Sequence, residues 1–161
     1  MEIILFEPDI PQNTGNIVRL CKATKCKLTL VEPLGFTITD KKLRRAGLDY
    51  WLGVEVKIIP SLKEYLLKTD APKYFLSSKA PRSLYSAEIK KDAIFIFGSE
   101  TAGLPAYAKE LWNNDFYTLP MHKEARCLNL ANSVSIAIYE ALRQQDFSSL
   151  DLFQSSLSLS T

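Results

Sequence analysis

Short apolar runs alternate with polar loops along most of this chain. Five such runs end at turn-forming residues, which is typical of strands buried on both faces, and they cover residues 2–6, 27–31, 54–59, 73–78 and 93–98. Segments with helical spacing or helix-capping residues lie between several of these runs. An order of strand, helix and strand predicts a parallel sheet. We therefore expect an α/β fold with a mostly parallel sheet and helices on both faces.

Four segments carry the three-and-four spacing or the capping residues that indicate helices: one beginning after a polar loop at 11–16, a basic one over 40–47, one over 61–69, and one from 128 onward. The last of these follows a polar loop over 121–126. Asn129 stands among its apolar positions, and a buried amide is costly unless it is hydrogen-bonded. Two interpretations remain open for this stretch, a capped helix entering the core or a loop pinned by amides around a ligand.

Length and composition are those of an ordinary globular domain. With 161 residues, 47% hydrophobic and 24% charged, we expect one domain over residues 1–145, followed by a frayed serine-rich and leucine-rich tail at 146–161. No apolar run approaches the roughly 20 residues of a membrane helix, and the N-terminus lacks a charged leader. Three cysteines and no secretion signal favour reduced thiols. We expect a cytoplasmic protein that does not enter membranes.

Three loops share one arrangement, since each follows a buried strand, is rich in Gly, Asn or Pro, and precedes a helix. The third follows an apolar strand end that Pro120 closes. Gly98 follows the clearest buried strand, and Gly98 and Gly103 allow the backbone to approach a ligand closely. Glu100 adds a carboxylate between them, which either meets the ligand or caps the following turn. Ligands of open α/β sheets bind at the carboxyl ends of the strands. Convergence of the three loops predicts one pocket.

The net charge of +2 does not by itself indicate a nucleic-acid partner. A dense local patch does exist on the predicted helix at 40–47. Two interpretations are open for it, a solvated helix face or contacts to phosphate groups. The patch consists of Lys41, Lys42, Arg44 and Arg45.

At these loops the sequence resembles a known family. PQNTGNIVRLC, FGSETAGLP and LPMHKEARCLNLANSV resemble the three signature motifs of the SPOUT methyltransferases, and EPLGF with DKKLRRAGLDY resembles a branch that methylates the ribose of the tRNA wobble nucleotide, cytidine or a modified uridine. The resemblance spans residues 3–143. It implies a deep trefoil knot near the C-terminus, S-adenosylmethionine as cofactor, tRNA as substrate, and a homodimer in which the partner subunit completes each active site.

The resemblance also implies a set of cofactor-binding residues. Apolar side chains at strand ends suit the two faces of an adenine ring, and nearby backbone groups suit its edge and the ribose. Cys127 departs from the serine found in many relatives, so a hydroxyl contact becomes a weaker thiol contact. The cofactor-binding residues implied are Leu76, Gly98, Leu119, Met121, Cys127 and Leu128.

Transfer of a methyl group to a ribose 2′-oxygen needs a group that orients the hydroxyl or stabilises the developing alkoxide. The resemblance assigns this role to Arg19, whose alternative is an ordinary salt-bridged helix residue. Because a guanidinium stays protonated, we expect it to orient phosphate and hydroxyl. Asn16 and Asn129 are expected to position loops. Tyr139 is assigned to the pocket or substrate, with core packing as its alternative, and Arg126 joins the basic patch as a phosphate contact.

Other functions have weaker support. A noncatalytic RNA-binding module would use the basic patch and bind no cofactor, and a SPOUT methylase acting on another RNA ribose would share all three motifs. A thiol hydrolase would pair Cys127 with His122 but lacks a third residue. The cysteines and the histidine lack the paired spacing of a zinc site, so we expect no metal. The glycine pattern of dinucleotide-binding oxidoreductases is absent after the first strand.

Overall fold

The described strands form a single parallel sheet, in which several neighbouring strands are not consecutive along the chain. The computed structural model describes residues 1–37 and 53–150. Within them the strand order is β3-β2-β1-β6-β4-β7-β5, and every pairing between these strands is parallel. The expected α/β fold with a mostly parallel sheet is confirmed. The strands are β1 (Glu2–Phe6), β2 (Lys27–Val31), β3 (Val56–Ile59), β4 (Lys73–Leu76), β5 (Arg82–Ser83), β6 (Ile94–Phe97) and β7 (Phe116–Thr118).

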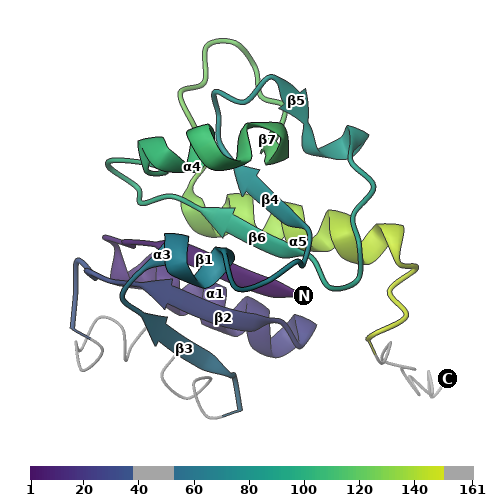
Figure 1. Ribbon diagram of the computed structural model, residues 1–161. Coiled ribbons are helices and arrows are strands. Elements are labelled where there is room, and N and C mark those ends of the chain that lie inside the picture. The colour runs from purple at the N-terminus through teal and green to yellow at the C-terminus, as the bar shows by residue number, and fades with distance from the viewer. Residues whose placement is uncertain (38–52, 151–161) are drawn as a thin grey trace, which may run out of the picture.

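Helices cover both faces of the sheet, as expected. Figure 1 shows α1 and α5 behind it and α3 and α4 in front of it. Two 3-10 turns, η1 and η2, complete the described elements. The helical bounds are α1 (Pro11–Thr24), α3 (Leu62–Leu66), η1 (Leu84–Ser86), α4 (Ala106–Trp112), η2 (Asn113–Asp115) and α5 (Leu130–Gln144).

The alternation of side chains along β1 divides the core into two clusters. Ile3 and Leu5 point to the face that α1 and α5 cover, whereas Ile4 points to the face of α3 and α4, and all three are fully buried. Burial of such a side chain contributes about 1.5–3 kcal/mol relative to exposure. Because both faces of the central strands are buried, these strands are continuous apolar runs.

The five predicted strands are all present, but α1 begins earlier than expected. The polar stretch 11–16, predicted as a loop, forms the first turns of α1, with Pro11 at the first helical position. Asn13, Thr14 and Gly15 are buried there. Tertiary packing thus overrides the weak helix propensity of these residues.

The other predicted helices differ in extent. Ser61 caps α3 as expected, accepting a hydrogen bond from the Glu64 amide at 3.3 Å, and α3 ends at Leu66. The basic helix predicted over 40–47 lies outside the described residues. After α5 the chain continues in turns, and the half-buried Phe147 and Leu150 pack against the core. The packed part of the chain therefore extends beyond the boundary predicted at 145, and residues 151–161 lie outside the described ranges.

Candidate functional site

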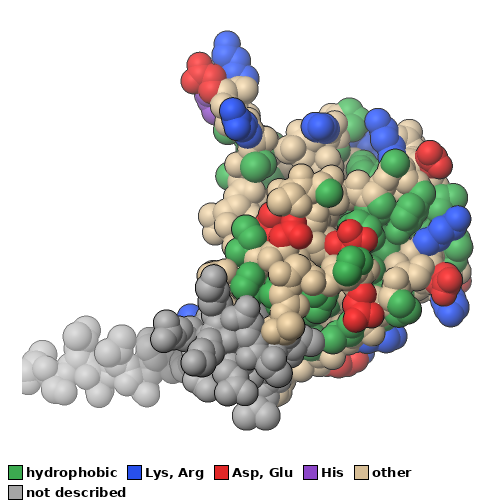
Figure 2. Space-filling view, turned by 90° about the vertical axis from the view of Figure 1, so that its left-hand side faces the viewer, with side chains coloured by type: hydrophobic (Ala, Val, Ile, Leu, Met, Phe, Trp, Pro, Cys, Tyr) green, Lys and Arg blue, Asp and Glu red, His purple; other side chains and the backbone are tan. Residues whose placement is uncertain are grey.

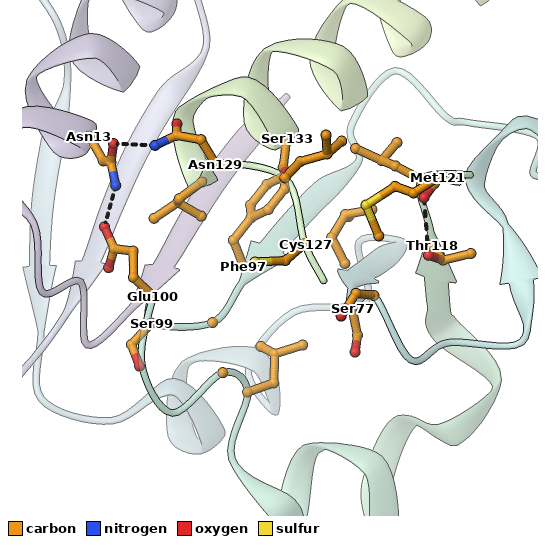
Figure 3. A pocket seen from close by; sticks show the side chains of 18 of the residues that line it. Asn13, Ser77, Phe97, Ser99, Glu100, Thr118, Met121, Cys127, Asn129 and Ser133 are labelled. Atoms are coloured by element: carbon orange, nitrogen blue, oxygen red, sulfur yellow. Dashed lines mark hydrogen bonds between the residues drawn. The ribbon is translucent and has the colours of Figure 1, made fainter. Parts of the chain in front are cut away.

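A cavity of about 360 Å³ opens at the carboxyl ends of β4, β6 and β7. This volume lies within the range of about 300–1,000 Å³ that is usual for small-molecule sites. Segments from all three predicted loops meet there, as Figure 3 shows. The residues that line it are Ile10, Asn13, Leu76, Ser77, Ser78, Phe97, Gly98, Ser99, Glu100, Gly103, Leu104, Thr118, Leu119, Met121, Cys127, Leu128, Asn129, Leu130 and Ser133.

A tight turn shapes the floor of this cavity beyond β6. The backbones of Ser99 and Gly103 exchange two hydrogen bonds, at 3.3 and 3.1 Å. A Cβ on Gly98 would lie 2.1 Å from the carbonyl carbon of Gly103 and 2.3 Å from the amide nitrogen of Leu104. Gly103 has a positive φ of 73°, which favours glycine. Gly98 and Gly103 are therefore required for different reasons, close backbone approach and backbone conformation.

A chain of side-chain hydrogen bonds ties the three loops together. The Asn13 amide, in the first turns of α1, donates to Glu100 Oε1 at 2.8 Å. The Asn129 amide donates to Asn13 Oδ1 at 2.9 Å, and Asn129 Oδ1 accepts from the Asn132 amide nitrogen at 3.3 Å as the N-cap of α5. Both Asn13 and Asn129 thus use their oxygen and nitrogen, as Figure 3 shows for the two links at Asn13. Asn129 thus both caps α5 and ties its loop to the first loop, so both interpretations of this stretch describe the structure, and the ligand stays a prediction.

The segment between β1 and α1 is tied to the same turn. Glu100 Oε2 accepts from the Asp9 amide nitrogen at 2.9 Å. Asp9 Oδ2 accepts in return from the Thr101 hydroxyl at 2.6 Å. Both oxygens of Glu100 therefore bond to the protein, and Pro105 is the N-cap of α4. The alternative that Glu100 caps the following turn is wrong, because its carboxylate joins that turn to the first loop.

The cavity wall is apolar with one charged group. Leu76, Phe97 and Leu119 are at most 8% exposed and form walls at the three strand ends. Glu100 is the one charged side chain among the described residues that line the cavity. Flat apolar surfaces with a carboxylate in the wall fit a ligand that combines an aromatic ring with positive charge.

Comparison with known proteins decides the family. The sequence pattern of the SpoU rRNA Methylase family matches residues 1–139. The chain belongs to this family. A relative from Saccharophagus degradans, named tRNA (cytidine(34)-2'-O)-methyltransferase, is 43% identical over 150 residues, which are 90% of this chain and 96% of the relative.

Solved structures agree with this assignment. A crystal structure from Bacillus anthracis is 42% identical, superposes with a TM-score of 0.85, and is matched over 94% of this chain and 98% of its own. Another structure, presented as giving insights into the 2-OH methylation of C/U34 on tRNA, is 36% identical with a TM-score of 0.81, covering 91% and 96% of the two chains. The SpoU methylase fold is therefore present over nearly the whole chain.

All six residues expected to bind the cofactor line this same cavity of the SpoU methylase chain. They come from the ends of β4, β6 and β7 and from the loop that precedes α5. The side chain of Cys127 lies beside the cavity in Figure 3. Their contact with a cofactor stays a prediction. The residues are Leu76, Gly98, Leu119, Met121, Cys127 and Leu128.

The residues expected to act on the substrate lie elsewhere. Asn16 and Arg19 are exposed on α1 and do not line the cavity of their own chain. The hydrogen bonds that tie the loops together start from Asn13, three residues before Asn16. The loop-positioning role of Asn16 stays a prediction. Tyr139 is 47% exposed on α5, so the alternative of a core residue is wrong for the described chain.

The loop between β7 and α5 projects from the body of the molecule. Figure 2 shows the projection, marked by the purple of the chain's one histidine. Arg126 is exposed in this loop, and Lys41, Lys42, Arg44 and Arg45 lie outside the described residues. His122 Nδ1 faces Glu124 Oε2 at 3.8 Å, and no hydrogen bond joins it to Cys127 within the described chain. This arrangement does not support the thiol hydrolase alternative.

The thiols of Cys21 and Cys26 are expected to react slowly. Burial raises the pKa of Cys21 well above the usual value of a thiol and also raises the pKa of Cys26, so both stay protonated at neutral pH. Cys127 is exposed. Thiol reactivity of the folded protein is therefore expected at Cys127.

Asn13 is the site residue that the sequence reasoning missed. A proline at the first helical position is a common helix start, so Pro11 was a signal that α1 begins there. A helix from Pro11 places Asn13 in its first turn, next to the strand ends. Among residues 1–37 and 53–150, no group of three His, Cys, Asp or Glu is placed to hold a metal ion. No described helix is long and apolar enough to cross a membrane.

Proposed function

We propose that the protein transfers a methyl group from S-adenosylmethionine to the ribose 2′-oxygen of the wobble nucleotide of tRNA. The observation that carries the proposal is the cavity at three strand ends, lined by every residue that the resemblance assigns to the cofactor. Relatives from Yersinia pestis and Saccharophagus degradans, at 42% and 43% identity, are named tRNA (cytidine(34)-2'-O)-methyltransferase. A protein with this substrate is expected in the cytoplasm.

The residues present fit S-adenosylmethionine. The buried side chains of Leu76 and Leu119 offer apolar walls for an adenine ring, and the Glu100 carboxylate offsets positive charge in the cavity. The Ser99–Gly103 turn brings backbone close to the ligand without an intervening side chain. Bound there, the cofactor would supply an electrophilic methyl group.

The chain must then hold the acceptor hydroxyl and its phosphate. Arg19 is suited to this role because a guanidinium offers several donors in a fixed plane, which match phosphate oxygens and a ribose hydroxyl. Asn13 holds the loop that carries the cavity floor by its bond to Glu100. In this proposal Arg19 orients the hydroxyl, and Asn13 and Asn129 keep the cavity in shape.

Arg19 serves the cavity of a second copy in this proposal. Asn16, Arg19 and Tyr139 are exposed on α1 and α5, which pack side by side on one face of the sheet. Ile136 of α5 is also 36% exposed on the same helix. A homodimer through this face would bury apolar side chains and bring Arg19 of one protomer to its partner's cavity.

The strand order also supports a knotted chain. β7 pairs with β4 on one side and with β5 on the other. The segment that joins β4 to β5 must therefore cross the carboxyl end of β7, where the loop toward α5 leaves the sheet. We infer that this loop passes through the crossing to form the trefoil knot.

The test is transfer of a labelled methyl group from S-adenosylmethionine to total tRNA, with the modified nucleotide mapped. We expect label on a wobble ribose, and a loss of about 100-fold or more in turnover for Arg19→Ala with cofactor affinity unchanged. Lys68→Ala removes an exposed cation from the segment that joins α3 to β4, outside the cavity lining, and serves as the matched control. Label on another ribose would show that the wobble nucleotide is not the acceptor. RNA binding without cofactor binding would show that the protein is not a methyltransferase.

A further inference from the structure

The segment that follows β4 forms one wall of the cavity and then turns outward to solvent. Its first two residues, Ser77 and Ser78, line the cavity. It continues through β5 and η1, at the same end of the molecule as the loop that leaves β7 in Figure 1. We call residues 77–86 the rim.

Backbone hydrogen bonds hold the rim against the cavity. The Ser77 amide donates to the Tyr117 carbonyl at 2.9 Å, and the Ala80 amide donates to the Ser77 carbonyl at 3.1 Å. In the register of β5 with β7, Ser83 is opposite Thr118, which itself lines the cavity. The rim is thus a fixed border of the site, with its outer residues within a few positions of the lining.

The exposed face of the rim is cationic. Lys79 and Arg82 are exposed, and neither makes an ion pair with any residue of the ranges 1–37 and 53–150. Residues 77–87 contain no Asp or Glu. The Arg82 guanidinium stacks over the Tyr117 ring at 4.8 Å, which orients its plane. It also acts on the Asp115 carboxylate, because burial raises the pKa of that group and the charge of Arg82 lowers it against this effect. Two exposed cations at the cavity border suit phosphate groups.

An exposed aromatic ring completes the rim. Tyr85 is 53% exposed, whereas its neighbour Leu84 is fully buried and anchors the turn. The Tyr85 amide donates to Ser83 Oγ at 3.2 Å, and the Ser86 hydroxyl donates to the Ser83 carbonyl at 2.7 Å, so the backbone is held while the ring is left in solvent. Aromatic rings presented beside cations are the usual platform on which unpaired bases stack.

We propose that the rim is an RNA-binding surface, in which Lys79 and Arg82 bind phosphates flanking the target nucleotide and Tyr85 stacks on an unpaired base beside it. This inference rests on the proposed function and adds the surface that grips the single-stranded loop. A loop of tRNA fits better than a duplex, because a stacked base must be free of its pairing partner.

The experiment measures binding of an anticodon stem-loop RNA, over a range of salt, in the presence of the demethylated cofactor so that no turnover occurs. Lys79→Ala with Arg82→Ala is expected to lower the salt slope by about 1.4, since each phosphate contact to a single strand contributes about 0.7. The matched control is Lys68→Ala with Lys91→Ala, which removes the same charge from two exposed sites that precede the amino ends of β4 and β6, whereas the cavity opens at the carboxyl ends of these strands. We expect that control to leave the salt slope unchanged.

Tyr85→Ala tests the stacking contact. Loss of one stacked base is expected to weaken binding of the stem-loop about 10-fold, with Tyr85→Phe retaining most of the affinity and a blunt duplex of equal length unaffected. Calorimetric affinity for S-adenosylmethionine should be the same in every variant, because none of these side chains lines the cavity.

The outcomes separate the two proposals. If the wild-type protein methylates tRNA and all rim variants bind RNA with unchanged affinity, the rim is not an RNA-binding surface, and the proposed function is still supported. Equal losses in the rim and control pairs would also overturn the rim inference, since they would reflect net charge alone. If the wild-type protein transfers no methyl group to tRNA, the proposed function fails and the rim inference fails with it.

Discussion

Replacing Gly98 with alanine tests the geometry of the cavity floor. The added Cβ would lie 2.1 Å from the carbonyl carbon of Gly103, and an ordinary contact begins at 3.4 Å, so backbone must move by more than about 1 Å. Overpacking of this kind costs about 1–3 kcal/mol. The two hydrogen bonds between Ser99 and Gly103 open with the shift, at about 1 kcal/mol each. We expect Gly98→Ala to lose about 4 kcal/mol of stability.

Gly103→Ala is the matched control in the same turn. Nothing lies within 4 Å of a Cβ at Gly103, so its cost is the positive φ of 73° alone, about 1–2 kcal/mol. In urea titrations with a slope of about 2 kcal/mol per molar, Gly98→Ala should lower the midpoint by about 2 M and Gly103→Ala by less than about 1 M. Calorimetry should show a larger loss of S-adenosylmethionine affinity for Gly98→Ala. Equal midpoints for the two variants would refute the reasoning.

Three further predictions concern the loops and the last helix. Asn13→Asp places a carboxylate beside Glu100 Oε1, in place of an amide that donates at 2.8 Å, and should weaken cofactor binding more than Asn13→Ala does. Adding Glu100→Gln to Asn13→Asp should recover most of the lost affinity. A lack of recovery would mean that the bond between Asn13 and Glu100 does not shape the cavity. A maleimide should label Cys127 before the two buried cysteines, and bound cofactor should slow the labelling; mass spectrometry showing no protection would place the cofactor elsewhere. Hydrogen bonds from Arg143 and Gln144 lower the pKa of the buried Glu140 carboxylate. The ionised carboxylate therefore stabilises the fold above the usual carboxyl pKa, and this stabilisation is lost as pH falls through the lowered pKa. In thermal melts below about pH 4, the Glu140→Gln variant should lose less stability than the wild type does.

The longer strands could be predicted from the sequence because their burial on both faces requires uninterrupted runs of apolar residues. Residues 94–97 are buried at every position, so apolar side chains occur without interruption. The cavity floor was also readable in part, because Gly98 directly follows this strand. β5 and β7 are short, with two and three residues, and their half-buried or exposed side chains give no such run, so that of β7 only the apolar end before Pro120 was predicted. They are placed by pairing within the sheet, which the local sequence does not encode.

The start of α1 was misread for a reason that also hid Asn13. Asparagine and glycine favour turns when only local preferences act. In the structure the polar groups of residues 13–15 are buried, and Asn13 is held by Glu100 and Asn129 from distant parts of the chain. Asn16 was assigned a loop-positioning role with the motif as a whole, whereas the hydrogen bonds that tie the loops start from Asn13. The identity of the loop-positioning residue therefore depends on tertiary contacts.

The bonds that hold the three loops together also determine when the site can exist. Asn13 is joined to partners 87 and 116 residues away along the chain, and the second of these partners caps the last helix. A nascent chain that still lacks this helix would have the first two loops but no closed cavity. Contacts of such long sequence separation form late and make folding slow. Cofactor binding would then require that synthesis has finished and the cavity has formed, so that a truncated copy would not bind the methyl donor.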